Sequence, residues 1–279
     1  MARKGTLVDR DKLFEAIQAK QSYLCVGLDP DPDRIPSCFG AGVEALELFC
    51  NSIVSCTSHV AVAFKPNLAF FESYGPSGIE ALQRIIANIP EDCLVIADAK
   101  RGDIGNTSSM YAKAFFENMS FDSVTVAPYM GADSVTPFLE FKDKWAIVLT
   151  LTSNKGGLDF QKIQDENGKQ LFEKVLDTSK EWGTDENMMY VVGATRAEEF
   201  LEIRAIVPNH FLLVPGVGAQ GGSLKDVAKY GLNLDCGLLV NSSRGIIYAG
   251  NDVDFAVKAK KEAHKLQQEM AIILSEAGI

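Results

Sequence analysis

Short apolar runs rich in β-forming residues recur along the chain, and each is followed by a turn and a segment with helical spacing of apolar positions. Strands alternating with helices indicate parallel pairing. Between Leu28 and Val240 the pattern takes seven steps of about 30 residues, as a (β/α)8 barrel of ~250 residues requires. We predict eight strands: Tyr23–Leu28, Val60–Phe64, Leu94–Ala97, Ser123–Ala127, Ala146–Leu151, Met189–Gly193, Phe211–Val214 and Leu238–Val240.

The segments between these runs have the periodicity of amphipathic helices. Ser77–Asn88 carries apolar residues at helical spacing, and Ser77 is its predicted N-cap because it follows Gly75-Pro76. Asn154–Gly157, early in the longest connection, is predicted to be a mobile loop. Further helices are predicted at Asn106–Asn118, Gln170–Glu181 and Asp252–Ala277.

No Ser/Gly-rich linker or block of like charges divides the chain into two halves. The 279 residues are 47% hydrophobic, which is enough for one large core. Single α/β barrels commonly reach this length. We therefore predict an α/β fold with one domain, a (β/α)8 TIM barrel that spans residues 1–279.

Charge and composition limit the kinds of partner that we expect for this protein. The formal net charge is −10, and a polyanion needs a basic face, so we expect no nucleic-acid partner. No run of 18 apolar residues and no apolar leader are present, so we expect no membrane span. Six cysteines without C-x-x-C spacing and three scattered histidines give no zinc pattern. We expect a cytoplasmic protein without a bound metal.

Polar and charged residues follow the ends of the predicted strands. In (β/α)8 barrels the active site lies at the C-terminal ends of the strands, so these side chains should converge on one pocket. Several carboxylates and cations are among them. The candidates are Asp29, Lys65, Asp98, Lys100, Asp103, Ser153, Gln220 within the loop Gly216–Gly222, and Arg244.

The densest group of candidates follows the third strand. Asp98 and Lys100 are two residues apart, so they face the same side if the chain stays extended there. Asp103 and Thr107 are four apart and would share one face of the following helix. A simpler interpretation makes Asp103 a helix N-cap and Asp98–Lys100 an ion pair. Because such groups are rarely buried unless paired or functional, the sequence favours an active site.

A glycine-rich loop follows the seventh predicted strand, and Arg244 follows the eighth. Loops at these two places form the common phosphate site of such barrels, where backbone N–H groups and a forked guanidinium meet the phosphate oxygens. Gly216, Gly218 and Gly221 also match the dinucleotide pattern G-x-G-x-x-G, with Asp235 19 residues on. That interpretation is disfavoured because the loop follows the seventh strand and Asp235 precedes its own strand.

The group Asp98-x-Lys100-x-x-Asp103-Ile104 is similar to the D-x-K-x-x-D-I signature of orotidine 5'-monophosphate (OMP) decarboxylases. The element alone is shared with related sugar-phosphate decarboxylases, but other blocks also resemble this family and stand in the same order. They are Cys25–Asp29, Phe64–Asn67, Leu213–Gly221 and Asn241–Gly245. The long connection after Ser153 suggests the longer, type 2-like subgroup.

The resemblance implies that the protein converts OMP to UMP in pyrimidine biosynthesis without a cofactor. It implies that Lys100 protonates C6 and that Asp98 lies beside the departing carboxylate. Asp29 and Lys65 would hold the ribose and orient the charged group.

The resemblance also implies a homodimer in which Asp103, Ile104 and Thr107 reach into the neighbouring subunit's site. The remaining predicted contacts are with the nucleotide. Ser153, with Thr152 as the alternative, would contact the pyrimidine amide edge, and Pro215, Gln220 and Arg244 would bind the substrate, the last two at the phosphate.

The residue chemistry agrees with a decarboxylation. Loss of CO2 leaves electron density on carbon, which a lysine held by carboxylates can stabilise before it acts as a general acid. Two carboxylates ~4 Å apart repel by about 4 kcal/mol at an effective dielectric near 20, so Asp98 could destabilise the bound substrate.

Two alternatives remain open. One is a metal-dependent sugar-phosphate decarboxylase or lyase on the same scaffold, although Lys65 stands where an additional metal-binding acid would be expected. The other is a non-catalytic nucleotide-binding barrel, which would need only the phosphate contacts.

Overall fold

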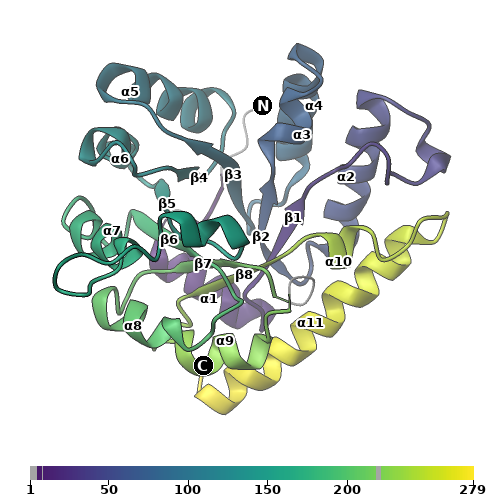
Figure 1. The fold of residues 1–279 in the computed structure, drawn as a ribbon. Helices are drawn as coiled ribbons and strands as arrows, with labels where there is room; N and C mark the ends of the chain where they lie inside the picture. The colour runs from purple at the N-terminus through teal and green to yellow at the C-terminus, as the bar shows by residue number, and fades with distance from the viewer. Residues whose placement is uncertain (1–4, 8, 218–220) are drawn as a thin grey trace.

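Eight parallel strands close into a barrel in sequence order, and β1 pairs with both β2 and β8. The computed structural model describes residues 5–7, 9–217 and 221–279 (Figure 1). All eight predicted strands and their parallel pairing are confirmed, with boundaries that shift by a few residues at most. The strands are β1 Leu24–Leu28, β2 Ala61–Pro66, β3 Leu94–Arg101, β4 Ser123–Val126, β5 Trp145–Leu151, β6 Met188–Val192, β7 Leu212–Pro215 and β8 Leu238–Ser242.

Helices surround the barrel and connect consecutive strands (Figure 1). Those between strands are α2 Val43–Thr57, α3 Leu68–Glu72, α4 Pro76–Asn88, α5 Gly105–Lys113, α6 Ala132–Leu139, α7 Leu171–Ser179, α8 Glu199–Ile206 and α9 Leu224–Gly231. Before β1 lies α1 Arg10–Lys20, and after β8 come α10 Arg244–Ile247 and α11 Phe255–Ala277. Shorter turns are the 3-10 helices η1 Ser37–Phe39 and η3 Lys155–Asp159 and the π-helical η2 Ala114–Asn118.

The predicted helices are confirmed, but the predicted N-cap of one of them is wrong. Gly75 is the N-cap of α4, and Ser77 lies inside the helix, where its hydroxyl donates to Tyr74 O. Pro76 accounts for this, because its fixed φ suits the first helical position and moves the cap one residue earlier. The segment predicted as a mobile loop forms η3.

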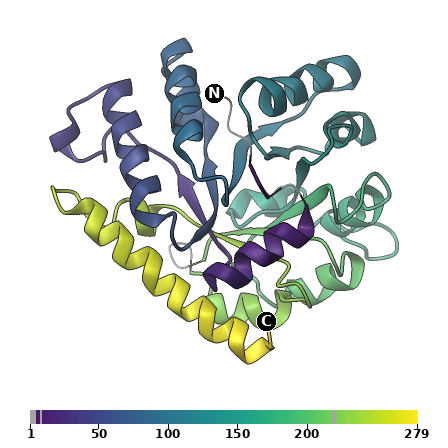
Figure 2. The ribbon, with the colours of Figure 1, turned by 180° about the vertical axis from the view of Figure 1, so that it is seen from behind.

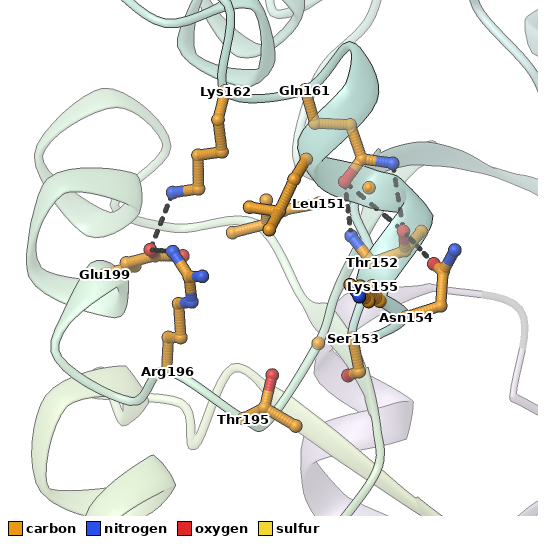
Figure 3. Close-up of a pocket in the computed structure, with 13 residues that line it drawn as sticks. Leu151, Thr152, Ser153, Asn154, Lys155, Gln161, Lys162, Thr195, Arg196 and Glu199 are labelled. Carbon is orange, nitrogen blue, oxygen red and sulfur yellow. Dashed lines mark hydrogen bonds and ion pairs between the residues drawn. The ribbon is translucent and has the colours of Figure 1, made fainter.

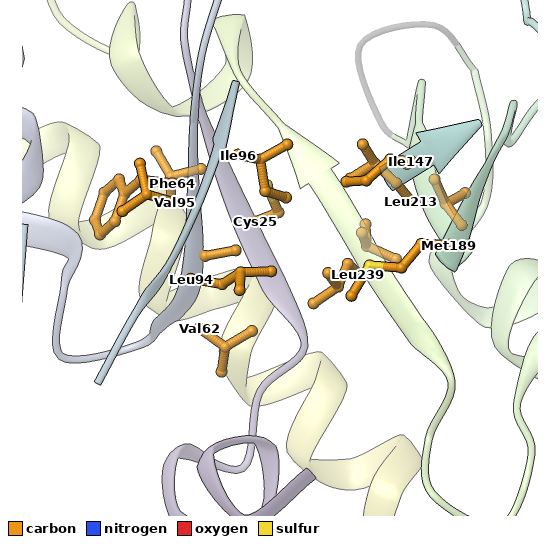
Figure 4. Close-up of a cluster of buried hydrophobic side chains, with 14 of the residues drawn as sticks. Cys25, Val62, Phe64, Leu94, Val95, Ile96, Ile147, Met189, Leu213 and Leu239 are labelled. Carbon is orange, nitrogen blue, oxygen red and sulfur yellow. The ribbon is translucent and has the colours of Figure 1, made fainter. Parts of the chain in front are cut away.

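The barrel interior is a packed core and not a channel. Every residue of β1, β2, β4, β6 and β8 is buried, which explains why these strands are rich in apolar residues, although β2, β4 and β8 also bury polar residues such as Lys65, Thr125 and Asn241. Figure 4 shows side chains such as Leu94, Ile147, Met189 and Leu239 in one cluster of buried hydrophobic residues. Burying one such side chain contributes about 1.5–3 kcal/mol, so the strands form a rigid platform for the residues at their ends.

Helix α1 lies across the end of the barrel at which the strands begin (Figure 2). Lys20 Nζ donates to Ala61 O at the start of β2, 2.9 Å away. Arg10 pairs with Asp185 and Asp235, which precede β6 and β8. The opposite end, where the strands finish, is therefore left for the site. Among the described helices, none is long and apolar enough to cross a membrane.

Candidate active site

Three charged side chains from β2 and β3 form a continuous array at the C-terminal end of the barrel. Lys65 Nζ lies 2.5 Å from Asp98 Oδ2, and the other oxygen of Asp98 binds Lys100 Nζ. The side chains of Lys65 and Asp98 are 7% and 10% exposed, whereas that of Lys100 is 52% exposed. A carboxylate with a buried ammonium on one side and an accessible ammonium on the other is therefore fixed at the barrel mouth.

The backbone of β3 turns Lys100 toward this array. Lys100 has a φ of 48°, in the left-handed region that non-glycine residues seldom occupy, and the register between β3 and β4 shifts between Ala97 and Arg101. Thr125 on β4 stabilises the bulge, because its Oγ1 accepts from the N–H groups of Ala99 and Lys100 at 3.0 and 2.9 Å. Strained backbone held by such contacts is typical of functional sites.

Electrostatics keep Lys65 and Asp98 charged. Burial by itself would raise the pKa of Asp98, but the ammonium groups of Lys65 and Lys100 outweigh it and lower that pKa to about 2. Burial would lower the pKa of Lys65, but Asp98 and then Asp29 outweigh it, so the pKa lies above its usual value. At neutral pH Lys65 and Asp98 therefore form an ion pair at the barrel mouth.

Asp29, just after β1, is held by Ser243, which follows β8, and by Tyr248, which follows α10. Ser243 Oγ donates to Asp29 Oδ2 at 2.5 Å, and the Tyr248 hydroxyl donates to Asp29 O at 2.7 Å. The same hydroxyl accepts from Asp31 N–H at 2.5 Å. The Oδ1 atom of Asp29 is buried and has no hydrogen-bond partner among the described residues, so its hydrogen-bonding capacity is not met within them.

A cavity of about 400 Å³ opens beside the charged array, and its volume suits a nucleotide base and sugar. Lys65, Asp98 and Lys100 form its charged wall, and Ser153 and Pro215 line it from β5 and β7. Its apolar side comes from Leu149, Val191 and Leu213. The structure thus brings five of the sequence-predicted residues to one cavity.

Ser153 and Thr152 both line this cavity, but their hydroxyls differ. Thr152 Oγ1 donates to Asn154 Oδ1 at 2.6 Å and accepts from Gln161 Nε2 at 2.9 Å. Ser153 Oγ has a single long contact with Pro215 O at 3.5 Å. Ser153 is therefore the hydroxyl that is more available to a ligand.

The predicted phosphate side lies between the ends of β7 and β8. Arg244, the first residue of α10, is exposed, and its guanidinium has no ion pair within the described part of the chain. Gly216 has a φ of 100°, which only glycine adopts readily, and Gly222 N–H returns to Gly216 O at 3.2 Å. Gln220 lies outside the described residues.

Asp103, Ile104 and Thr107 stand apart from the cavity. Asp103 is not the N-cap of α5, since that position belongs to Ile104 and has no side-chain cap. Asp103 Oδ1 accepts from Ile104 N–H, and the helix begins only at Gly105, so Asp103 and Thr107 do not share a helical face as predicted. Ile104 is 52% exposed, and Thr107 is exposed as well.

The dinucleotide interpretation fails on geometry. Asp235 lies at the far end of the barrel, where its carboxylate pairs with Arg10 Nη2 at 2.5 Å. Among the described residues, no group of three or more His, Cys, Asp or Glu is arranged to hold a metal ion.

Thr125, Ser243 and Tyr248 are the residues that sequence reasoning missed. Ser243 and Tyr248 act on Asp29 from more than 200 positions away, and Thr125 reads as an ordinary strand residue. Only the position of Ser243 at the end of the eighth strand, next to Arg244, was a usable signal.

A closed (β/α)8 barrel with a charged array in a cavity at its C-terminal mouth has the architecture of an enzyme. Comparison with known proteins identifies the family. Residues 22–259 match the family described as orotidine 5'-phosphate decarboxylase / HUMPS. The chain is 56% identical to the orotidine 5'-phosphate decarboxylase of Phocaeicola vulgatus over 272 residues, covering 96% of this chain and 100% of that protein. The enzyme of that name from Flavobacterium johnsoniae is 58% identical, with coverage of 94% and 97%.

Solved structures agree with the sequence matches. The structure of Leishmania donovani OMP decarboxylase superposes with a TM-score of 0.83 at 37% identity, covering 94% of this chain and 97% of that one. Leishmania donovani UMP synthase gives 0.85 at 38% identity, covering 97% of this chain and 56% of that one. The chain therefore belongs to the orotidine 5'-phosphate decarboxylase / HUMPS family, and within it to the carboxy-lyases. The resemblance inferred from the sequence and the predicted barrel are both confirmed.

Proposed function

We propose that this protein decarboxylates orotidine 5'-monophosphate to UMP in pyrimidine biosynthesis. The observation that carries the proposal is the Lys65–Asp98–Lys100 array, which faces a cavity of nucleotide size. The relatives named orotidine 5'-phosphate decarboxylase are 56% and 58% identical to this chain over nearly their whole length, which supports the same reaction here.

The array suits the chemistry of the step. A substrate carboxylate placed next to Asp98 meets a carboxylate whose low pKa keeps it ionised, so the two negative charges repel. As CO2 leaves, the ammonium of Lys100 stabilises the electron density on C6 and then transfers a proton to that carbon. Lys65 remains buried and holds Asp98 in place.

The rest of the nucleotide fits the remaining predicted residues. The free oxygen of Asp29 accepts a ribose hydroxyl, Ser153 contacts the pyrimidine amide edge, and Pro215 packs beside the base. Arg244, together with Gln220, binds the phosphate, as a forked cation at the end of β8 is suited to do.

We also propose that the single barrel domain works as a homodimer. Among the described residues, Lys100 has one carboxylate partner, Asp98. Asp103 Oδ1 instead accepts from Ile104 N–H of its own chain. Several large apolar side chains near Asp103 are exposed, and such patches mark protein interfaces. They are Ile104, Met110, Tyr111, Tyr129 and Met130. A second copy that covers them would receive Asp103, Ile104 and Thr107 at its own site.

The alternative of a metal-dependent lyase has less support, because Lys65 places a cation where a metal would need an acid. The alternative of a non-catalytic nucleotide-binding barrel leaves the costly burial of Lys65 and Asp98 unexplained. The test is to add OMP to EDTA-treated protein and follow the loss of the orotate absorbance. We expect full conversion to UMP. No conversion by folded protein would refute the proposal, and conversion that returns only with added metal would favour the lyase.

A further inference from the structure

Residues Thr152–Asn154, which include Ser153, line two cavities and separate them. The main cavity of about 400 Å³ lies on one side. A second cavity of about 160 Å³ lies on the other and is also lined by Gln161 and Glu199 (Figure 3). Side chains in a protein core are fixed by close packing. A segment with open volume on both faces has little of this packing, so hydrogen bonds must hold it in place.

The Gln161 side chain supplies these hydrogen bonds. Its Oε1 accepts from Thr152 N–H at 2.9 Å, and its Nε2 donates to Thr152 Oγ1, also at 2.9 Å. In Figure 3 the Gln161 carboxamide faces Thr152 from the side opposite to the Ser153 side chain. The carboxamide therefore binds both the backbone and the side chain of the residue that precedes Ser153.

Gln161 is itself attached to the body of the barrel. Its carbonyl accepts from Phe172 N–H at 3.1 Å, at the start of α7. The adjacent Lys162 pairs with Glu199, the first residue of α8, at 2.6 Å, and its ammonium lies 4.4 Å from the centre of the Phe172 ring. Gln161 is thus attached to α7 directly and to α8 through Lys162, and its own N–H donates to Gly157 O in η3 at 2.9 Å.

The position of Ser153 depends on its backbone, because its side chain is weakly held. A Cβ atom on Gly193 would overlap Ser153 Oγ, so the hydroxyl rests against the bare backbone of the chain after β6. Its contact with Pro215 O is 3.5 Å long and contributes little. A displacement of Thr152 would therefore carry the Ser153 hydroxyl with it.

We propose that Gln161 is a positioning residue that fixes Ser153 for recognition of the pyrimidine amide edge. The inference rests on the proposed function, since it assigns Gln161 to the site that binds the base. Gln161 touches no substrate atom and acts only through Thr152 and Ser153. It therefore determines how well a uracil ring is bound, and it leaves the ribose and phosphate contacts unchanged.

The test compares Gln161→Met, which keeps the side-chain length and loses both hydrogen bonds, with Gln161→Glu, which keeps an acceptor for Thr152 N–H. Affinities for UMP and for ribose 5-phosphate are measured by titration calorimetry. We expect Gln161→Met to bind UMP about five- to tenfold more weakly, the effect of roughly one lost hydrogen bond, and ribose 5-phosphate equally well. We expect Gln161→Glu to bind UMP within about twofold of the wild type. Gln161→Ala supplies the same comparison if the methionine variant does not fold.

A second background separates positioning from general damage. In Ser153→Ala protein, Gln161→Met should have no further effect on UMP affinity, because coupled residues are not additive. Three outcomes would each overturn the inference about Gln161 but not the proposed function. They are unchanged UMP binding by Gln161→Met, an equal loss of ribose 5-phosphate binding, and full additivity with Ser153→Ala. A wild-type protein that neither binds UMP nor converts OMP would instead overturn the proposed function.

Discussion

Asp98 is the side chain on which the charges at the barrel mouth depend. It is 10% exposed and shares its two oxygens between Lys65 and Lys100. Removing one partner of a buried pair leaves an uncompensated charge, which costs about 3–5 kcal/mol. Lys65 and Asp98 therefore depend on each other, whereas Lys100 is half exposed and remains accessible to a ligand.

At the scale of single residues, we expect Lys100→Ala to lose turnover and keep nucleotide binding. General acid catalysis alone contributes about 10²–10⁴-fold, and in the proposed mechanism Lys100 also stabilises the charge formed as CO2 leaves, so the fall in kcat should exceed that range. Because Lys100 is half exposed, its removal leaves the fold intact. Steady-state kinetics with OMP and calorimetry with UMP measure the two effects.

Lys113→Ala is the matched control, since Lys113 is an equally exposed lysine on α5 that pairs with Glu117. It should behave as the wild type in both measurements. A Lys100→Ala protein that still turns over OMP at a rate near the wild type would contradict the assigned role.

His210 gives a prediction about acid stability. Both ring nitrogens are buried without a hydrogen-bond partner in the described structure, and the ring lies 5.3 Å from that of Tyr190. Burial lowers the pKa of His210 from 6.5 to about 4. The unfolded chain therefore binds a proton at this histidine first as pH falls. The contribution of neutral His210 to the unfolding free energy is fully present above pH 6.5 and is lost between pH 6.5 and 4.

Replacing this histidine with a residue that does not titrate should remove that loss. We expect His210→Phe to reduce the decrease in unfolding free energy between pH 6.5 and 4 by on the order of 2 kcal/mol. Urea unfolding at several pH values measures it, and His264→Phe, on the surface of α11, is the control. An identical pH dependence for His210→Phe and the wild type would show that His210 titrates normally.

At the scale of elements, α10 joins two parts of the proposed site. Arg244 begins the helix and Tyr248 follows its end, where the tyrosine hydroxyl bridges Asp29 O and Asp31 N–H. Arg34 lies 4.0 Å from the Tyr248 ring and Phe49 stacks on it at 5.7 Å. Tyr248 thereby holds the backbone at Asp29 on the side where the proposed phosphate site lies.

We expect Tyr248→Phe to raise the KM for OMP about fivefold with a smaller effect on kcat. The ring contacts survive, but the hydroxyl that bridges Asp29 O and Asp31 N–H is lost, and Asp31 N–H keeps only its 2.9 Å bond to Asp29 O. Losing such hydrogen bonds costs about 0.5–1.5 kcal/mol each and loosens the backbone at Asp29. Steady-state kinetics measure the change. Tyr230→Phe on α9, whose hydroxyl meets only Lys229 among the described residues, is the control. An unchanged KM would mean that Asp29 needs no support from α10.

The strands were predictable because buried parallel strands are continuous apolar runs, and all eight runs are strands. The length of β3 was not, since Asp98, Lys100 and Arg101 are polar, and the strand continues through them only because Thr125 on β4 holds the bulge. The N-cap at Ser77 was wrong because the order of Pro76 and Ser77 decides which residue precedes the helix. The local sequence determines which segments form strands, whereas long-range contacts determine how far a strand continues through polar residues.

The candidate site was predictable to the same extent. Residues that directly follow the predicted apolar runs, such as Lys65, Asp98 and Pro215, lie at the cavity, because the barrel topology brings all strand ends together. Residues that act through others, such as Gln161 and Tyr248, were missed because their contacts cross nine and 219 positions. No spacing rule connects residues that meet only after the loops have folded.

At the scale of the whole molecule, the exposed apolar side chains around α5 and the β4–α6 turn need an explanation that one chain does not provide. Tyr129 is 94% exposed, and Met130 Cε would lie 3.6 Å from a Cβ on Gly102, next to Asp103. The patch and the proposed cross-subunit residues are therefore on the same face. A symmetric dimer formed through this face would place each Asp103 close to its partner's site.

Mixing two inactive variants tests whether the site is shared. In Lys100→Ala both sites lack the proposed proton donor, and in Asp103→Ala both lack the proposed second carboxylate. A mixed dimer contains one site with Lys100 from one subunit and Asp103 from the other. Random exchange makes about half of the dimers mixed, so mixing should restore about a quarter of wild-type activity. If Asp103 served the site of its own chain, every site in every mixture would lack one residue, and activity would stay at the level of the separate variants.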